Sequence, residues 1–79
     1  MKLDNQTAEK IALLINGIMT ADHMEDARDE NGHRMYDYTV WHTAKCRDII
    51  ELNDTYGIAL PNLNSAIDYL KARAIKGLD

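Results

Sequence analysis

Residues 11–19 read IALLINGIM, and the apolar residues of this stretch recur with the period of an α-helix. Positions i, i+3, i+4, i+7 and i+8 fall on one face of a helix. Here they are occupied by Ile11, Leu14, Ile15, Ile18 and Met19. The pattern therefore predicts an amphipathic helix that buries this face.

The predicted first helix begins near Asn5 and ends near Ala21. Asp4 or Asn5 can cap its first turn, because a short polar side chain there accepts hydrogen bonds from free backbone N–H groups. Continuing the same helical turn would place Asp22 inside the apolar arc. We therefore expect the helix to end or bend near Ala21.

Two further helices are predicted in the second half of the chain. One covers about residues 39–56 and ends at Gly57, because glycine adopts the left-handed conformation at a helix C-terminus without steric cost. The other begins near Pro61, since proline is tolerated in the first turn of a helix, and it ends before Gly77. The predicted core gathers the apolar residues of all three helices: Ile11, Leu14, Ile15, Ile18, Met19, Trp41, Ile49, Leu52, Ile58, Leu63, Ile67 and Leu70.

The segment of residues 22–38 is compatible with more than one structure. Asp22 followed by Glu25 resembles a helix-capping arrangement, so a short polar helix ending at Glu30 is the first choice. Asn31-Gly32 is also a favoured hairpin turn with residues 34–40 as a second strand, although residues 27–30 contain no strand former. Disorder is the third alternative.

These elements predict one all-α domain over residues 1–79. Helices that face one another form a small bundle, here of three to four helices, with a possible short hairpin within residues 27–40. The predicted core is thin for a monomer, so a homodimer or stabilisation by a partner is possible at this size.

Composition narrows the class of protein. Thirteen acidic against nine basic residues give a net charge of −4, which argues against nonspecific nucleic-acid binding, because that requires a cationic surface. The single cysteine, Cys46, permits no internal disulfide and is typical of a reducing compartment. No apolar run approaches the roughly 20 residues that span a bilayer, and the first residues lack the apolar core of a signal peptide. We expect a cytoplasmic protein without membrane association.

Motifs for catalysis or metal binding are not found in the sequence. His42 and Cys46 are four residues apart on a predicted helix and offer two ligands, but zinc needs three or four. A packed, hydrogen-bonded core histidine is the simpler interpretation of His42. A glycine-rich phosphate loop, a zinc-protease motif and a nucleophile elbow are also missing. We therefore expect neither an enzyme nor a metal or other cofactor.

The most distinctive stretch is residues 22–41. Five acidic residues lie between positions 22 and 30, and three of the five aromatic residues of the chain follow, together with Met35 and Val40. Tyrosine and tryptophan are favoured in contact patches because they provide large, rigid area. We interpret this stretch as a partner-binding surface made of Asp22, Glu25, Asp26, Asp29, Glu30, Tyr36, Tyr38 and Trp41.

An acidic strip beside aromatic residues suits a basic protein surface, and it can also imitate the charges of a nucleic-acid backbone. The leading hypothesis is therefore a non-catalytic inhibitor or adaptor. Its partner would be a larger basic protein, for example a nucleic-acid-binding protein. Small inhibitors of the kind that phages and mobile elements encode share this size and acidity.

The second hypothesis is a DNA-binding regulator that uses residues 49–76. A helix, a glycine turn and a second helix loosely match the helix-turn-helix pattern. Asn53 and the apolar turn after Gly57 depart from that pattern. The start of the second helix also contains no basic residue, so nucleic acid is the less favoured partner. The residues that would approach DNA are Asn64, Ser65, Tyr69, Arg73 and Lys76.

Overall fold

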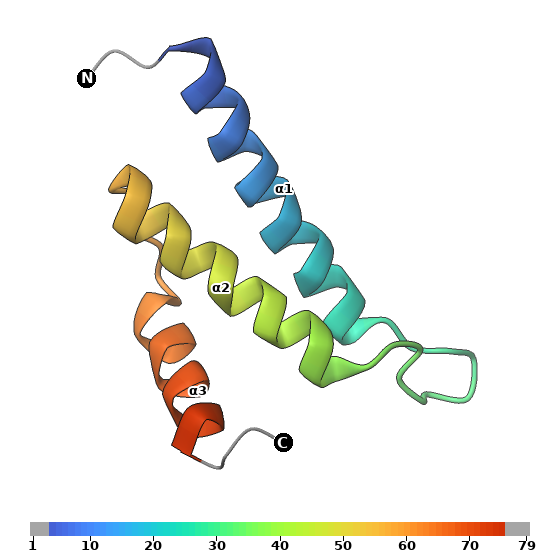
Figure 1. Cartoon of the computed structure of the whole chain (residues 1–79). Coiled ribbons are helices and arrows are strands. Elements are labelled where there is room, and N and C mark those ends of the chain that lie inside the picture. The colour runs from blue at the N-terminus through green and yellow to red at the C-terminus, as the bar shows by residue number, and fades with distance from the viewer. Residues whose placement is uncertain (1–3, 76–79) are drawn as a thin grey trace.

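The computed structural model describes residues 4–75, which form three α-helices and no β-strand (Figure 1). The helices are α1 (Asn5–Asp26), α2 (Tyr38–Tyr56) and α3 (Leu63–Ile75). The all-helical prediction is confirmed, and the described residues contain three helices rather than four. None of these helices combines the length and the hydropathy that crossing a membrane would require.

Helix α1 begins as predicted but continues five residues past the predicted end. Asp4 caps it, with its Oδ1 accepting a hydrogen bond from the Thr7 backbone N–H at 2.6 Å, and this bond lowers the pKa of Asp4. The prediction of an end or bend near Ala21 is wrong, because Asp22 lies outside the buried face and is exposed.

The reason is the position of the buried face of α1. The shielded residues of the helix are Thr7, Ile11, Leu14, Gly17, Ile18, Ala21, Met24 and Glu25. At about 100° per residue, Leu14, Ile18, Ala21 and Glu25 lie close together and mark the centre of this face. Two residues of the predicted core lie beyond its edge: Ile15 is 42% exposed and Met19 is 65% exposed.

A connector of residues 27–37 joins α1 to α2. Its chain reverses near Gly32, which has a φ of 83°, and it contains one isolated antiparallel bridge between Arg28 and Arg34. The turn thus lies where the hairpin alternative placed it. The predicted strand of residues 34–40 does not form, because Asp37 caps α2 by accepting hydrogen bonds from Thr39 and Val40. The predicted polar helix up to Glu30 does not form either, since the backbone becomes extended at Ala27.

The end of α2 follows the sequence prediction. Gly57 has a φ of 69°, and its N–H donates to the Asn53 carbonyl oxygen at 3.0 Å. The N–H of Ile58 donates to the Leu52 carbonyl oxygen at 3.1 Å, which completes a C-terminal cap. Helix α3 then starts two residues after Pro61.

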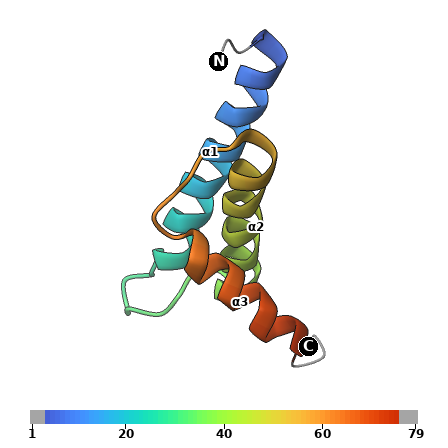
Figure 2. The ribbon, with the colours of Figure 1, turned by 90° about the vertical axis from the view of Figure 1, so that its left-hand side faces the viewer.

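Helix α2 is the centre of the fold. Both α1 and α3 pack against it, and within residues 4–75 these two outer helices make no contact with each other (Figures 1 and 2). The main core lies between α2 and α3, where Cys46, Ile49 and Ala66 are buried. Partly buried apolar residues surround it: Ile18, Ile50, Leu60, Leu63, Tyr69 and Leu70.

Candidate protein-binding surface

Four side chains form a polar cluster between α1 and α2, next to the connector: Asp22, Glu25, His42 and Lys45. Glu25 Oε2 accepts a hydrogen bond from His42 Nδ1 at 2.8 Å, and Glu25 Oε1 accepts one from Lys45 Nζ at 3.0 Å. Lys45 Nζ also donates to Asp22 Oδ1 at 3.0 Å. The carboxylate of Glu25 is therefore bound on both oxygens within the protein.

Burial and hydrogen bonding shift the pKa of Lys45 in opposite directions. Removal from water disfavours the charged amine, but the hydrogen bonds to Glu25 and Asp22 outweigh this effect and raise the pKa of Lys45. The side chain of Glu25 is only 7% exposed. Its assignment to the partner-binding surface is thus corrected: Glu25 joins α1 to α2 and is not available to a partner.

His42 connects all three helices. Its ring stacks on Tyr38 with a centroid distance of 5.0 Å, and the Tyr69 ring of α3 meets it edge-on at 4.3 Å. Together with the hydrogen bond to Glu25 of α1, these contacts confirm the prediction of a packed, hydrogen-bonded histidine. They also fix α2 against both of its neighbours at the connector end of the molecule.

The connector is held by its own side chains. Asp29 Oδ1 accepts hydrogen bonds from the backbone N–H groups of Asn31 at 2.8 Å and His33 at 3.0 Å. Arg28 Nη1 donates to the Gly32 carbonyl oxygen at 2.9 Å, and the Met35 N–H donates to the Ala27 carbonyl oxygen at 3.0 Å. A surface segment with this many internal hydrogen bonds has a defined shape.

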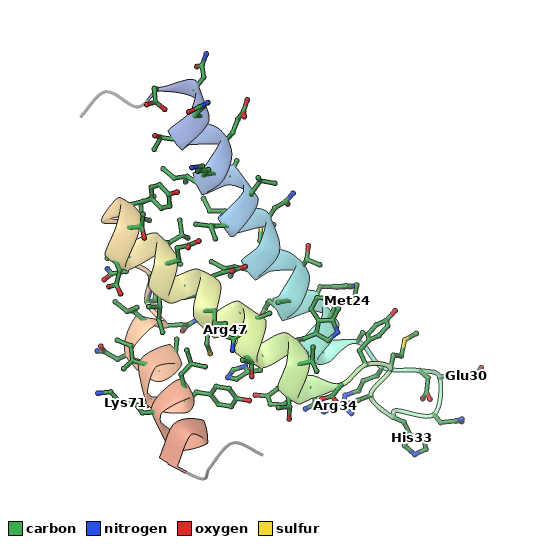
Figure 3. The ribbon with its side chains drawn as sticks, in the orientation of Figure 1. Met24, Glu30, His33, Arg34, Arg47 and Lys71 are labelled. Carbon is green, nitrogen blue, oxygen red and sulfur yellow. The ribbon has the colours of Figure 1, made fainter. Side chains whose placement is uncertain are left out.

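Arg34 attaches the connector to the helices. It donates a hydrogen bond to the backbone carbonyl oxygen of Glu25, and its guanidinium lies 4.7 Å from the centre of the Tyr38 ring. Figure 3 shows Arg34 at the base of the connector, while Glu30 and His33 lie at its outer end. The shape of the connector is therefore linked to the polar cluster through Tyr38 and His42.

Large apolar side chains nevertheless remain in solvent at this end of the molecule. Met35 is 53% exposed, Tyr36 is 42% exposed and Val40 is 59% exposed. Asp26 and Glu30 are exposed in the same segment of the chain. We call these five residues the loop-end surface: Asp26, Glu30, Met35, Tyr36 and Val40.

The other predicted binding residues are less available. Asp29 is exposed, but its carboxylate supports the connector backbone. Tyr38 is partly covered by His42 and Arg34, and Trp41 is half-buried. Met35 and Val40 were not among the predicted site residues. In the sequence they differ from other apolar residues only because neither belongs to the predicted core of the helices.

Internal pairing reduces the acidity of this region. Asp22 and Glu25 are engaged by Lys45 and His42. Four further acids remain in residues 26–37 against two arginines: Asp26, Asp29, Glu30 and Asp37. The connector region is still acidic, with a formal excess of two negative charges.

The residues of the DNA-binding alternative do not all lie on one open face. Asn64 and Ser65 are exposed on α3. Tyr69 instead faces the interior, where its ring contacts His42 and its hydroxyl lies 3.4 Å from Thr43 Oγ1. The side chain of Arg73 and all of Lys76 lie outside what the structure describes.

The side chains of residues 4–72 do not present three or more histidine, cysteine, aspartate or glutamate residues arranged to hold a metal ion. Burial raises the pKa of the Cys46 thiol, which disfavours the nucleophilic thiolate. Neither family models nor curated proteins nor solved structures gave a match to this chain.

Proposed function

We propose that this protein is a small non-catalytic binding module, an inhibitor or adaptor, that docks on a basic surface of a larger protein through its loop-end surface. The observation that carries the proposal is a connector held by internal hydrogen bonds that still exposes Met35 and Tyr36, next to the exposed Val40 in the first turn of α2. A segment with only a linking role would have no reason to combine both features.

The fixed shape of the connector favours binding. Association costs free energy when loops and side chains become ordered, so a segment that is already ordered binds more tightly for the same contacts. Asp29 and Arg28 hold the connector through hydrogen bonds within it, and Arg34 holds it against Tyr38 of α2. Tyr36 can then serve as an aromatic anchor, the type of residue that dominates binding free energies.

The charge of the region indicates the chemistry of the partner. Asp26 and Glu30 precede the exposed apolar side chains in sequence, and the connector region carries an excess of negative charge. Complementary charges speed encounter and select partners more than they add affinity. A basic protein surface, such as that of a nucleic-acid-binding protein, is the complementary class. A phage- or mobile-element-encoded inhibitor acting in the cytoplasm is the setting we propose, supported by the small size, the acidity and the free Cys46.

Site-specific photo-crosslinking in a cell lysate tests the proposal. A photoreactive phenylalanine derivative replaces Tyr36 in one variant and the exposed Asn64 of α3 in a matched control. The proposal predicts a crosslinked protein with a basic surface from position 36 only, in a complex that weakens as salt rises. Crosslinking from position 64 alone, or an acidic partner at position 36, would contradict it. DNA binding that is lost in Arg73→Ala would support the DNA-binding alternative instead.

A further inference from the structure

Helix α1 has an apolar surface that its own chain does not cover. Residues 11–21 contain no charged residue over eleven positions, yet α1 packs against α2 alone among the described helices. The side turned away from α2 exposes apolar or uncharged residues, which we call the outer face: Ala8, Ala12, Leu13, Ile15, Asn16 and Met19. Leu13 is 69% exposed, and Ile15 and Met19 are also well exposed. A helix that is apolar on nearly all sides is normally covered on more than one.

We propose that the outer face pairs with the outer face of a second copy of this chain, so that two α1 helices pack antiparallel in a homodimer. The proposal uses a surface other than the loop-end surface and does not depend on the proposed function. Three observations support a second copy as the occupant: the shape of the face, the polar residues at its two ends, and the small core of the single chain.

The shape of the outer face is self-complementary. Glu9, Ala12, Leu13 and Asn16 line a surface hollow of about 330 Å³. These positions have the i, i+3, i+4, i+7 spacing of a hole that receives one side chain of a facing helix. Met19 projects from the same face, nearly two turns further along α1. A twofold axis near residues 15 and 16 would place Met19 of each copy in the hollow of the other.

The polar residues at the two ends of the face match in the same arrangement. Glu9 lines the hollow, and His23 lies one turn beyond Met19. Both side chains are exposed. With the axis near residues 15 and 16, Glu9 of one copy faces His23 of the other, and the symmetry repeats this pair at the opposite end. A parallel arrangement would instead place each residue beside its own equivalent.

The size of the core explains why a second copy would be useful. Among the described residues, only five apolar residues are fully buried: Ala21, Cys46, Ile49, Leu52 and Ala66. Small domains with little buried area are often stabilised by oligomerisation. The first turns of α1 also extend beyond α2 (Figure 2). Pairing of two α1 helices would cover the part of the fold that lacks a neighbour.

Sedimentation equilibrium of the full chain over a wide concentration range provides the first test. We expect a dimer, and Met19→Glu should weaken it at least tenfold because it places a second carboxylate beside Glu9 in the hollow. Val40→Glu is the matched control, since it changes another exposed apolar residue and should leave the dimer unchanged. Circular dichroism establishes that both variants remain helical.

Disulfide trapping then tests the antiparallel arrangement. Ala12→Cys and Met19→Cys variants are mixed in equal amounts and oxidised, with the native Cys46 buried and unable to react. The proposal predicts that the mixed disulfide between positions 12 and 19 is the main product. A monomer at all concentrations, a Met19→Glu variant that stays dimeric, or disulfides formed mainly between identical positions would each overturn it. Binding of the monomeric wild-type protein to lipid vesicles, abolished by Met19→Glu, would assign the face to a membrane surface instead.

Discussion

The two interfaces of α2 differ in chemistry. Against α3 it packs apolar residues around Cys46, Ile49 and Ala66. Against the end of α1 it places charged and polar groups, with Glu25 bound to His42 and Lys45. Apolar burial is proportional to area and has little directional preference, whereas buried polar groups need specific partners. At the connector end, the polar cluster therefore sets the alignment of α1 on α2, whereas the packing around Ile49 stabilises the fold through apolar burial.

The largest expected effect comes from the apolar interface. Ile49→Ala removes a side chain that is only 2% exposed, and it should lower the free energy of unfolding by about 2–5 kcal/mol. Urea denaturation monitored by circular dichroism measures this change. A loss below about 1 kcal/mol would contradict the tight packing of Ile49 between α2 and α3.

The polar cluster should give a smaller loss of stability. Glu25→Ala leaves His42 without its carboxylate and Lys45 with Asp22 as its remaining acceptor. Leaving a buried donor without its partner costs about 1–3 kcal/mol. Glu25→Gln keeps the size of the side chain and should lose less. If Glu25→Ala were as stable as the wild type, the polar cluster would have no role in fixing the interface.

Much of this fold is predictable from local sequence. Asp4 and Gly57 act within one turn of their own helix, so their caps could be assigned from residue type alone. The buried face of α1 was harder, because residues 11–21 carry no charge and their apolar side chains occur on more than one side of the helix. In the structure Met19 lies outside the core and Glu25 lies within it.

The candidate site was predictable only in part. The position of the acidic and aromatic stretch was correct as a surface segment, since residues 31–40 are all exposed. The role of Glu25 was not predictable, because its partners His42 and Lys45 lie 17 and 20 residues away in sequence. Local patterns carry no information on such pairs until α1 and α2 are placed side by side.

A third prediction concerns the close approach of α1 and α2 at Gly17. A Cβ atom at this position would lie 2.5 Å from Asp48 Oδ2, so Gly17→Ala should displace Asp48 and destabilise the protein by about 1 kcal/mol or less. In an Asp48→Ala background the same change should be stabilising, because alanine favours helix over glycine by about 1 kcal/mol. Thermal denaturation of the wild type, the two single variants and the double variant measures both effects. Equal effects in both backgrounds would contradict the contact.

The smallest expected effect is the pH dependence of Asp48. Burial, followed by repulsion from Glu51, raises the pKa of this carboxyl in the folded state. The folded state therefore binds the proton more tightly than the unfolded state, so Asp48 destabilises the fold at neutral pH. This penalty is relieved as the pH falls through the raised pKa. Melting temperatures of the wild type and Asp48→Asn should differ at neutral pH, with the variant higher, and converge in acid. A constant difference would contradict the assignment.

The division between the two interfaces is tested most directly by amide hydrogen exchange in the connector. In the wild type, the backbone N–H groups of Asn31 and His33 donate to the Asp29 carboxylate, and that of Met35 donates to the Ala27 carbonyl oxygen. The amide hydrogens of these three residues should therefore exchange slowly. Glu25→Ala should accelerate them much more than it accelerates the amides of α3. Ile49→Val, which costs about 0.5–1.5 kcal/mol, is the comparison and should accelerate α3 without selectively affecting the connector. Fast connector exchange in the wild type, or the same exchange pattern in both variants, would contradict the account.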